Sequence, residues 1–157
     1  LEEIAESVFQ YAGASSDYEA TPLIFTLYDD GSFFEVDPSV MSYEPEREYY
    51  ERILTTMMQT IKDELSGHNP YNRVETVNSR RFIYTDDTCI SLIQASYREN
   101  ILDMHFVLRS SEVATTFRYD LKFLHYLTSL VYTALGLNRS KDIVRMRFNL
   151  NSAHILS

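Results

Sequence analysis

Cysteine, tryptophan, glycine and proline are all scarce in this chain, which has one Cys, no Trp, four Gly and four Pro in 157 residues. A single cysteine, Cys89, excludes an internal disulfide and a thiolate metal cluster, so we expect a reducing compartment and a cytoplasmic location. No apolar run approaches the roughly 20 residues that cross a bilayer, and the acidic start is unlike a signal peptide. We therefore expect neither a membrane span nor export.

Basic residues are also in the minority, with 14 Lys and Arg against 23 Asp and Glu and a net charge of -9. A negative charge opposes attraction to phosphate backbones and to anionic lipid, so we expect no nucleic acid and no membrane surface as a partner. A hydrophobic content of 45% in 157 residues is enough for a core. We predict a single domain over residues 1–157.

Apolar residues recur at helical spacing in three segments, which we predict to be helices. The segments are residues 1–12, 45–65 and 121–135, and each is followed by a glycine within two positions. Two β-rich runs surround Asp30-Gly31 in residues 22–36, which is typical of a hairpin. Further β-rich runs are residues 73–84, 89–98, 101–109 and 142–150. The order of these elements favours an α+β fold.

Several polar residues follow the lone cysteine in a specific order, although a lone cysteine by itself is usually a small buried hydrophobe. The residues are Cys89, Arg109, Ser110, Glu112, Asp120 and His154. Asp120 by itself could simply cap the helix that we predict from residue 121. Taken together and in this order, the residues resemble those of the thymidylate synthase and deoxycytidylate hydroxymethylase family.

The resemblance implies a thymidylate synthase-like fold, in which a mixed β-sheet packs against a long central helix. In that family an Arg-Ser-x-Asp motif binds the nucleotide phosphate and the folate. Arg109 and Ser110 match its phosphate ligands, and Glu112 stands at the aspartate position. Cys89 matches the nucleophile, and His154 matches a histidine that holds the ribose.

Two matches upstream of the cysteine complete the resemblance. In the family, the catalytic glutamate stands a fixed number of residues before a glycine, and Glu6 and Gly13 have the same spacing. From the residues alone, Glu6 is interpreted as an acidic residue in the first turn of a helix. In the family, a segment before the cysteine contributes phosphate-binding arginines to the site of the partner subunit. Arg73 lies in a segment that resembles it, and Arg80 and Arg81 are the alternative candidates for this role. The family therefore implies a homodimer.

The chemistry of this residue set is coherent. A thiolate from Cys89 that adds to C6 of a pyrimidine makes C5 able to attack a one-carbon electrophile. Arg109 is a plausible group to depress the pKa of that thiol, and a buried Glu6 carboxyl would move protons. Cytosine presents an acceptor at N3 and a donor at N4, which a protonated carboxyl at Asp120 complements.

These residues lead to the hypothesis of a (deoxy)cytidylate 5-hydroxymethylase that acts on a pyrimidine nucleoside monophosphate with 5,10-methylenetetrahydrofolate. A thymidylate synthase acting on dUMP is the same-class alternative, and Asp120 argues against it. A non-catalytic nucleotide-binding or scaffold domain of the same fold is the third hypothesis, because Ile90 and Leu156 replace the family's His and Tyr. The resemblance covers the middle of the family's length, without the first strand and the C-terminal segment.

Overall fold

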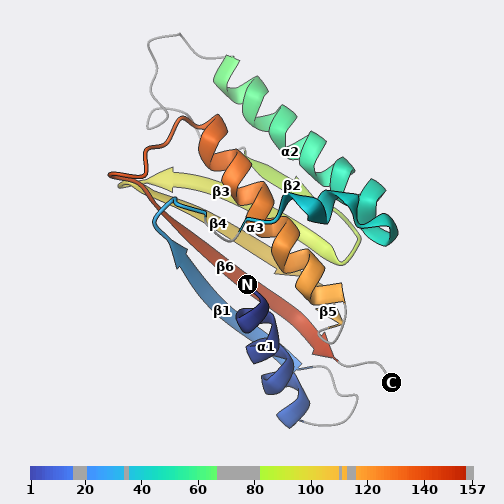
Figure 1. Ribbon diagram of the computed structural model, residues 1–157. Coiled ribbons are helices and arrows are strands. Elements are labelled where there is room, and N and C mark those ends of the chain that lie inside the picture. The colour runs from blue at the N-terminus through green and yellow to red at the C-terminus, as the bar shows by residue number, and fades with distance from the viewer. Residues whose placement is uncertain (16–20, 34–35, 67–81, 110, 113–115, 155–157) are drawn as a thin grey trace.

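The computed structural model of this chain describes residues 1–15, 21–33, 36–66, 82–109, 111–112 and 116–154. Within these ranges, three α-helices lie in front of one β-sheet (Figure 1). The helices are α1 (Glu2–Ser15), α2 (Arg47–Ser66) and α3 (Thr116–Ala134), and the short 3-10 helices η1 (Pro38–Ser42) and η2 (Glu44–Glu46) precede α2. None of the helices in the described ranges is long and apolar enough to cross a membrane.

The sheet is mixed. Its strands are β1 (Thr21–Asp29), β2 (Ile83–Thr85), β3 (Ile90–Arg98), β4 (Ile101–Leu108), β5 (Ser111–Glu112) and β6 (Ile143–His154). They follow the order β1-β6-β4-β3-β2, and β5 pairs with β6 beyond the end of β4. Strands β4 and β6 are parallel, and such a pair needs a long crossover, which contains α3. The arrangement is α+β, as the sequence predicts, and the thymidylate synthase-like fold stays a prediction.

The helix-facing side of the sheet forms the core together with α3. Alternate residues of β4 are fully buried, namely Leu102, Met104, Phe106 and Leu108. From α3 come Phe117, Phe123, Leu127 and Val131, which are also fully buried. Burial of one such side chain contributes about 1.5–3 kcal/mol relative to exposure, so α3 is held firmly on the sheet. Asp120 stands three residues from Phe117 and from Phe123, and this spacing puts it on the same buried face.

Most predicted elements are confirmed, with shifted ends. Helix α1 continues through Gly13 to Ser15, and α3 begins at Thr116 rather than at residue 121. Strands β3 and β4 pair as an antiparallel hairpin, and its turn residues Glu99 and Asn100 have φ of 54° and 63°. Positive φ at both turn residues matches the twist that joins neighbouring strands. Of the predicted strand at 73–84, residues 82–84 fall in the described ranges and 73–81 outside them.

The hairpin predicted around Asp30-Gly31 is wrong in the part of residues 22–36 that the structure describes. Strand β1 ends at Asp29, whose carboxylate accepts the Gly31 N–H at 2.7 Å, and Gly31 has φ of 86°. The chain then leaves the sheet, because the Phe33 ring packs 5.5 Å from the His125 ring and 5.3 Å from the Tyr132 ring of α3. Strand β1 pairs with β6 instead, a partner distant in sequence.

Candidate functional site

Strand pairing brings Cys89 and Arg109 together, although they are far apart in sequence. Cys89 directly precedes β3, Arg109 directly follows β4, and the Arg109 N–H donates to the Cys89 carbonyl at 2.7 Å. The carboxyl of Asp120, from the second turn of α3, is close enough to act electrostatically on the Cys89 thiol, as does the Arg109 guanidinium. Three residues of the predicted set therefore meet at one end of the sheet.

Asp120 is a buried acid rather than a helix cap. Because α3 begins at Thr116, Asp120 lies within the helix, so the capping interpretation is wrong. The residue is 6% exposed, and the Tyr50 hydroxyl donates to its Oδ1 at 2.6 Å. Burial raises the pKa of Asp120 to about 7, the Tyr50 hydrogen bond opposes the rise, and Glu46 adds to it. Near neutral pH this carboxyl therefore exists in both protonation states.

The Cys89 thiol has a raised pKa in the free protein. The residue is exposed, yet partial burial of the thiol is the largest cause of the rise, followed by repulsion from Asp120. Arg109 lowers the pKa, and Glu46 raises it. Arg109 does lower the pKa of the thiol, as the sequence predicts. Burial and the carboxyls of Asp120 and Glu46 raise that pKa by more than Arg109 lowers it. Cys89 is mainly a protonated thiol at neutral pH.

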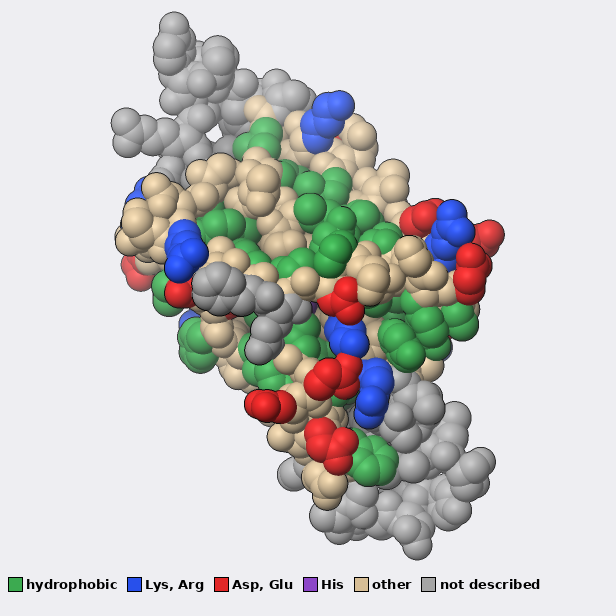
Figure 2. Space-filling model, viewed as in Figure 1, with side chains coloured by type: hydrophobic (Ala, Val, Ile, Leu, Met, Phe, Trp, Pro, Cys, Tyr) green, Lys and Arg blue, Asp and Glu red, His purple; other side chains and the backbone are tan. Residues whose placement is uncertain are grey.

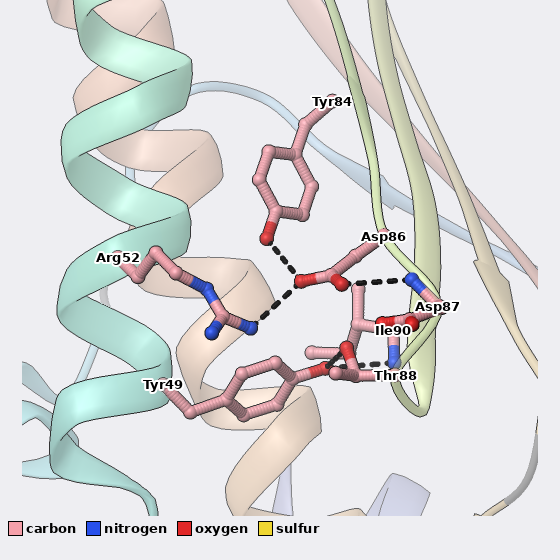
Figure 3. Close-up of polar contacts among 7 residues, drawn as sticks. All are labelled: Tyr49, Arg52, Tyr84, Asp86, Asp87, Thr88 and Ile90. Atoms are coloured by element: carbon pink, nitrogen blue, oxygen red, sulfur yellow. Dashed lines mark hydrogen bonds and ion pairs between the residues drawn. The ribbon is translucent and has the colours of Figure 1, made fainter.

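A hydrogen-bond network joins α2 to the loop that carries Cys89 (Figure 3). The Tyr49 hydroxyl accepts from the Thr88 hydroxyl and from the Ile90 N–H, both at 2.8 Å. On the same loop, Asp86 accepts from Tyr84 at 2.6 Å and from Arg52 at 2.7 Å. These contacts hold the loop before β3 against the first turns of α2.

The carboxylate of Asp86 stays ionised over most of the pH range. Its pKa falls to about 2, mainly because the Tyr84 hydroxyl donates to it, with smaller contributions from the Asp87 backbone and from Arg52. Burial opposes this shift, because the Asp86 side chain is only 16% exposed, but the hydrogen bonds and Arg52 together outweigh it. An ionised Asp86 keeps its ion pair with Arg52, so this anchor of the loop is present at neutral pH.

An open hollow of about 840 Å³ lies over the start of α2, beside this network, and Tyr49 and Arg52 line it. Its charges are mostly neutralised locally, since Arg47 contacts Glu44 at 3.2 Å and Glu51 at 3.4 Å. Figure 2 shows acidic and basic side chains side by side at this end of the helix-covered face. In the described part of the chain, no group of three or more His, Cys, Asp and Glu could hold a metal ion.

Glu6 does not join this site through any contact that the structure describes. Its carboxylate accepts from Gln10 at 2.9 Å, within the exposed side of α1. Helix α1 docks on α3 through Glu2 instead, which contacts Lys122 at 2.5 Å and Arg118 at 3.6 Å. The catalytic role of Glu6 stays a prediction from the resemblance.

The remaining predicted residues are described in part or not at all. Glu112 of β5 and His154 of β6 are partners in the strand register, so their backbones lie side by side next to the start of α3. Their side chains lie outside the described structure, as do Ser110 and Arg73 altogether. The alternative candidates, Arg80 and Arg81, also lie outside the described residues.

Sequence reasoning missed the two tyrosines at the start of α2. Tyr50 shares a helix face with Ile53 and Met57, so its spacing indicates a core residue, and its ring does stack on Phe123 at 4.2 Å. The only signal in the sequence was the hydroxyl itself, because a buried tyrosine needs a hydrogen-bond partner. That partner, Asp120, lies 70 positions away along the chain.

A second stacked pair, Tyr43 and Tyr119, stands next to Asp120 in sequence. The two ring centroids are 3.8 Å apart and nearly parallel, and both residues are half-buried. They place an aromatic surface beside the buried carboxyl.

No protein-family model matches this chain, and a search of curated proteins found no match. The functional interpretation therefore depends on the geometry of this site and on the resemblance of its residues.

Proposed function

We propose that this chain is a pyrimidine-nucleotide C5 hydroxymethylase that forms 5-hydroxymethyl-(d)CMP through a covalent adduct of Cys89 at C6. One observation carries the proposal. Cys89, Arg109 and Asp120, which come from separate elements, gather at one end of the sheet, and Asp120 there is a buried carboxyl with a pKa of about 7. A nucleophile, a cation for a phosphate and a protonatable acid are the groups that this reaction needs.

Asp120 suits cytosine because it can carry a proton at neutral pH. Its Oδ1 accepts from Tyr50 at 2.6 Å, and a carboxyl oxygen can accept a second hydrogen bond from the N4 amino group. The other oxygen, when protonated, donates to N3. As the Cys89 sulfur bonds to C6, the electron pair of the C5–C6 double bond moves into the ring, and the Asp120 proton at N3 stabilises the developing charge.

The raised pKa of Cys89 sets a condition for this mechanism. The Asp120 carboxylate and Glu46 both disfavour a thiolate, whereas Arg109 favours it. When Asp120 takes up a proton, its repulsion of the thiolate disappears. Cys89 and Asp120 are thus coupled, and the state with a thiolate and a protonated Asp120 has the same net charge as the resting state. That coupled state is the one competent for addition at C6.

Arg109 is the group in the described site that fits a nucleotide monophosphate. It is exposed, directly after β4, and a guanidinium offers paired donors that match phosphate oxygens better than an ammonium does. The roles of Ser110 and Arg73 in binding the same phosphate, and of His154 in holding the sugar, remain proposals from the resemblance.

The proposed cofactor, 5,10-methylenetetrahydrofolate, supplies a one-carbon unit when it is bound. A pterin ring needs an aromatic surface and a polar partner. The Tyr43–Tyr119 stack beside Asp120 provides such a surface, and the resemblance assigns Glu112 to the folate, a residue of β5, which contacts α3. The residues of this end of the sheet therefore fit the cofactor in kind.

A homodimer belongs to the same proposal. In the described residues, the helices cover one face of the sheet (Figure 1). Large apolar side chains are exposed on its strands. Ile24 is 73% exposed and Tyr28 is 68% exposed on β1. A two-fold axis through the open face would bury these side chains against a second copy. A monomer mass in sedimentation at tens of micromolar protein would contradict the dimer.

A non-catalytic nucleotide-binding domain is the second candidate, and the raised pKa of Cys89 favours it. A thiol that stays protonated in the free protein attacks slowly, since the thiolate is the nucleophile. The phosphate and base contacts of Arg109 and Asp120 do not depend on that thiolate. Such a domain would bind cytidine monophosphate and leave it unchanged.

Tritium release from 5-tritiated dCMP, CMP and dUMP, with methylenetetrahydrofolate present, separates these functions. We expect release from a cytosine nucleotide. Cys89→Ser should abolish it while nucleotide binding stays within about tenfold, because a nucleophile acts mainly in the transition state. Release from dUMP alone would identify a thymidylate synthase. Binding of the cytosine nucleotide without release would identify the non-catalytic domain, and release by Cys89→Ser would exclude the covalent mechanism.

A further inference from the structure

Two neighbouring tyrosines at the start of α2 point to different parts of the candidate site. Successive residues of an α-helix are rotated by about 100°, so adjacent side chains face different neighbours. Tyr49 reaches the loop before β3, and Tyr50 reaches α3. One helical turn thereby contacts the segment that presents Cys89 and also the carboxyl of Asp120.

The Tyr49 hydroxyl contacts the residues on both sides of Cys89. It accepts the Thr88 hydroxyl and the Ile90 backbone N–H, each at 2.8 Å (Figure 3). Thr88 and Ile90 are the neighbours of Cys89 in the chain, and Ile90 is also the first residue of β3. A single oxygen atom therefore holds the Thr88 side chain before the thiol and the Ile90 backbone after it.

The Tyr50 hydroxyl restrains Asp120 in the same way. It donates to Oδ1 at 2.6 Å, and the Tyr50 ring is fully buried and stacks on Phe123, one helical turn after Asp120. The stack holds the Tyr50 ring in place, and the Tyr50 hydroxyl in turn holds the Asp120 carboxyl with Oδ1 facing it. The other oxygen is then the one that can donate a proton to a bound ring.

We propose that Tyr49 and Tyr50 are positioning residues of the proposed reaction, Tyr49 holding the Cys89 thiol and Tyr50 holding the Asp120 carboxyl in the geometry that a cytosine ring requires. This inference rests on the proposed function and deepens it. Neither tyrosine needs to touch the ring. Arg52 and Asp86 form a separate anchor of the same loop, which keeps the loop folded when the Tyr49 hydroxyl is removed.

The thiol itself provides a direct readout, because Cys89 is the only cysteine in the chain. The rate at which iodoacetamide alkylates the free protein, measured against pH, reports the thiolate fraction at Cys89. The groups that act on this thiol are Glu46 of η2, Tyr49 of α2, Arg109 after β4 and Asp120 of α3. Tyr49→Phe leaves all of the charged groups in place and removes only the hydroxyl.

We expect Tyr49→Phe to raise the alkylation rate at pH 7 by about three- to tenfold, because a loosened loop exposes the thiol and the thiolate fraction rises tenfold for each unit by which the pKa falls. Tritium release should fall by at least about tenfold at the same time, because displacement of a reacting atom costs rate. A structural role alone would not raise reactivity while lowering turnover. Tyr126→Phe is the matched control, since Tyr126 lies on α3 and has no role in the proposed site, and it should stay within about twofold in both assays.

Tyr50→Phe tests the second half of the proposal. With the carboxyl free to rotate, the preference for cytidine over uridine monophosphate in competitive binding should fall by about three- to tenfold, the scale of one neutral hydrogen bond. Thermal unfolding of each variant reports whether it is folded. An unchanged preference in folded Tyr50→Phe would overturn the role of Tyr50.

Alkylation of folded Tyr49→Phe at the rate of the Tyr126→Phe control would overturn the role of Tyr49. Hydrogen exchange of the Ile90 amide in the unmodified protein is a further check, because the Tyr49 bond should protect it. Exchange at Ile90 as fast as at a solvent-exposed amide would contradict the inference. The alkylation and exchange measurements need no turnover, so they are decided separately from the proposed function, which the tritium-release assay tests.

Discussion

Two buried aspartates stand at opposite ends of α3, and each accepts a hydrogen bond from a tyrosine. Asp120 lies in the second turn of the helix and accepts from Tyr50 at 2.6 Å. Asp142 follows the helix, just before β6, and accepts from Tyr97 at 2.5 Å. The two sites contain the same pair of residue types, so the differences between them come from their surroundings.

The surroundings differ in the number of donors. Both oxygens of Asp142 are bonded, Oδ1 by Tyr97 and Oδ2 by the Asn138 N–H at 2.8 Å, and the residue is fully buried. Among the contacts described for Asp120, Tyr50 is the one donor, and the nearby Glu46 adds negative charge. Donors on both oxygens favour a structural carboxylate, whereas burial with one donor favours a carboxyl that can carry a proton.

The pH dependence of folding should show this difference with the largest effect. The pKa of Asp120 is about 7 in the folded protein, whereas an aspartate in an unfolded chain has a pKa of about 3.9. Between these values the folded state binds more protons, so the free energy of unfolding falls as the pH rises from about 4 to about 7. The fall amounts to as much as about 4 kcal/mol, at 1.36 kcal/mol for each pKa unit.

Urea unfolding of the unmodified protein and of Asp120→Asn over this pH range measures the contribution. As the pH rises, Asp120→Asn should become more stable relative to the unmodified protein. This difference in the free energy of unfolding should level off above about pH 8. A difference that stays constant from pH 4 to pH 8 would mean that the pKa of Asp120 is not raised by folding.

Asp142→Ala should cost about 3–4 kcal/mol of unfolding free energy, because the Tyr97 hydroxyl and the Asn138 N–H both lose their buried acceptor. Asp120→Asn is the comparison variant, and near neutral pH it should be at least as stable as the unmodified protein. Urea midpoints at pH 7.5 give both values. Equal losses in the two variants would remove the distinction between a structural and a functional aspartate.

Arg109→Ala should weaken binding of the nucleotide monophosphate by about 2–4 kcal/mol, the range for loss of one partner from a charge-assisted pair. Its folding should change little, because the side chain is exposed. Calorimetric titration with cytidine monophosphate measures the effect, and Arg98→Ala, an exposed arginine at the other end of β3, is a matched control. An unchanged dissociation constant in Arg109→Ala would locate the phosphate elsewhere.

The smallest effect concerns base preference. Asp120→Asn should shift the ratio of cytosine to uracil turnover towards uracil by about tenfold, or about 1.4 kcal/mol, because an amide can pair with uracil but cannot give a proton to N3 of cytosine. Binding of the cytosine nucleotide should fall less than its turnover. Competition between cytidine and uridine monophosphates in a tritium-release assay gives the ratio, and an unchanged ratio would leave Asp120 without a role in specificity.

Local patterns predicted much of this fold. The helical spacing of apolar residues identified α2, and the β-rich runs around Asn100 identified the β3–β4 hairpin, because both elements are stabilised by contacts close in sequence. The Asp30-Gly31 turn shows where local signals fail. The same residues that favour a hairpin also form an Asx turn, and the packing of Phe33 on α3 decided between the two.

The candidate site divides in the same way. The sequence by itself determined which chemical groups are present, a single thiol at Cys89, a guanidinium at Arg109 and a carboxyl at Asp120, because these are properties of residue types and their order. Only the tertiary structure decided that α3 begins early enough to bury Asp120, and that Tyr49 and Tyr50 reach across from α2. The protonation of Asp120 and of Cys89 depends on burial and on neighbours tens of residues away, and no local pattern in a sequence encodes those distances.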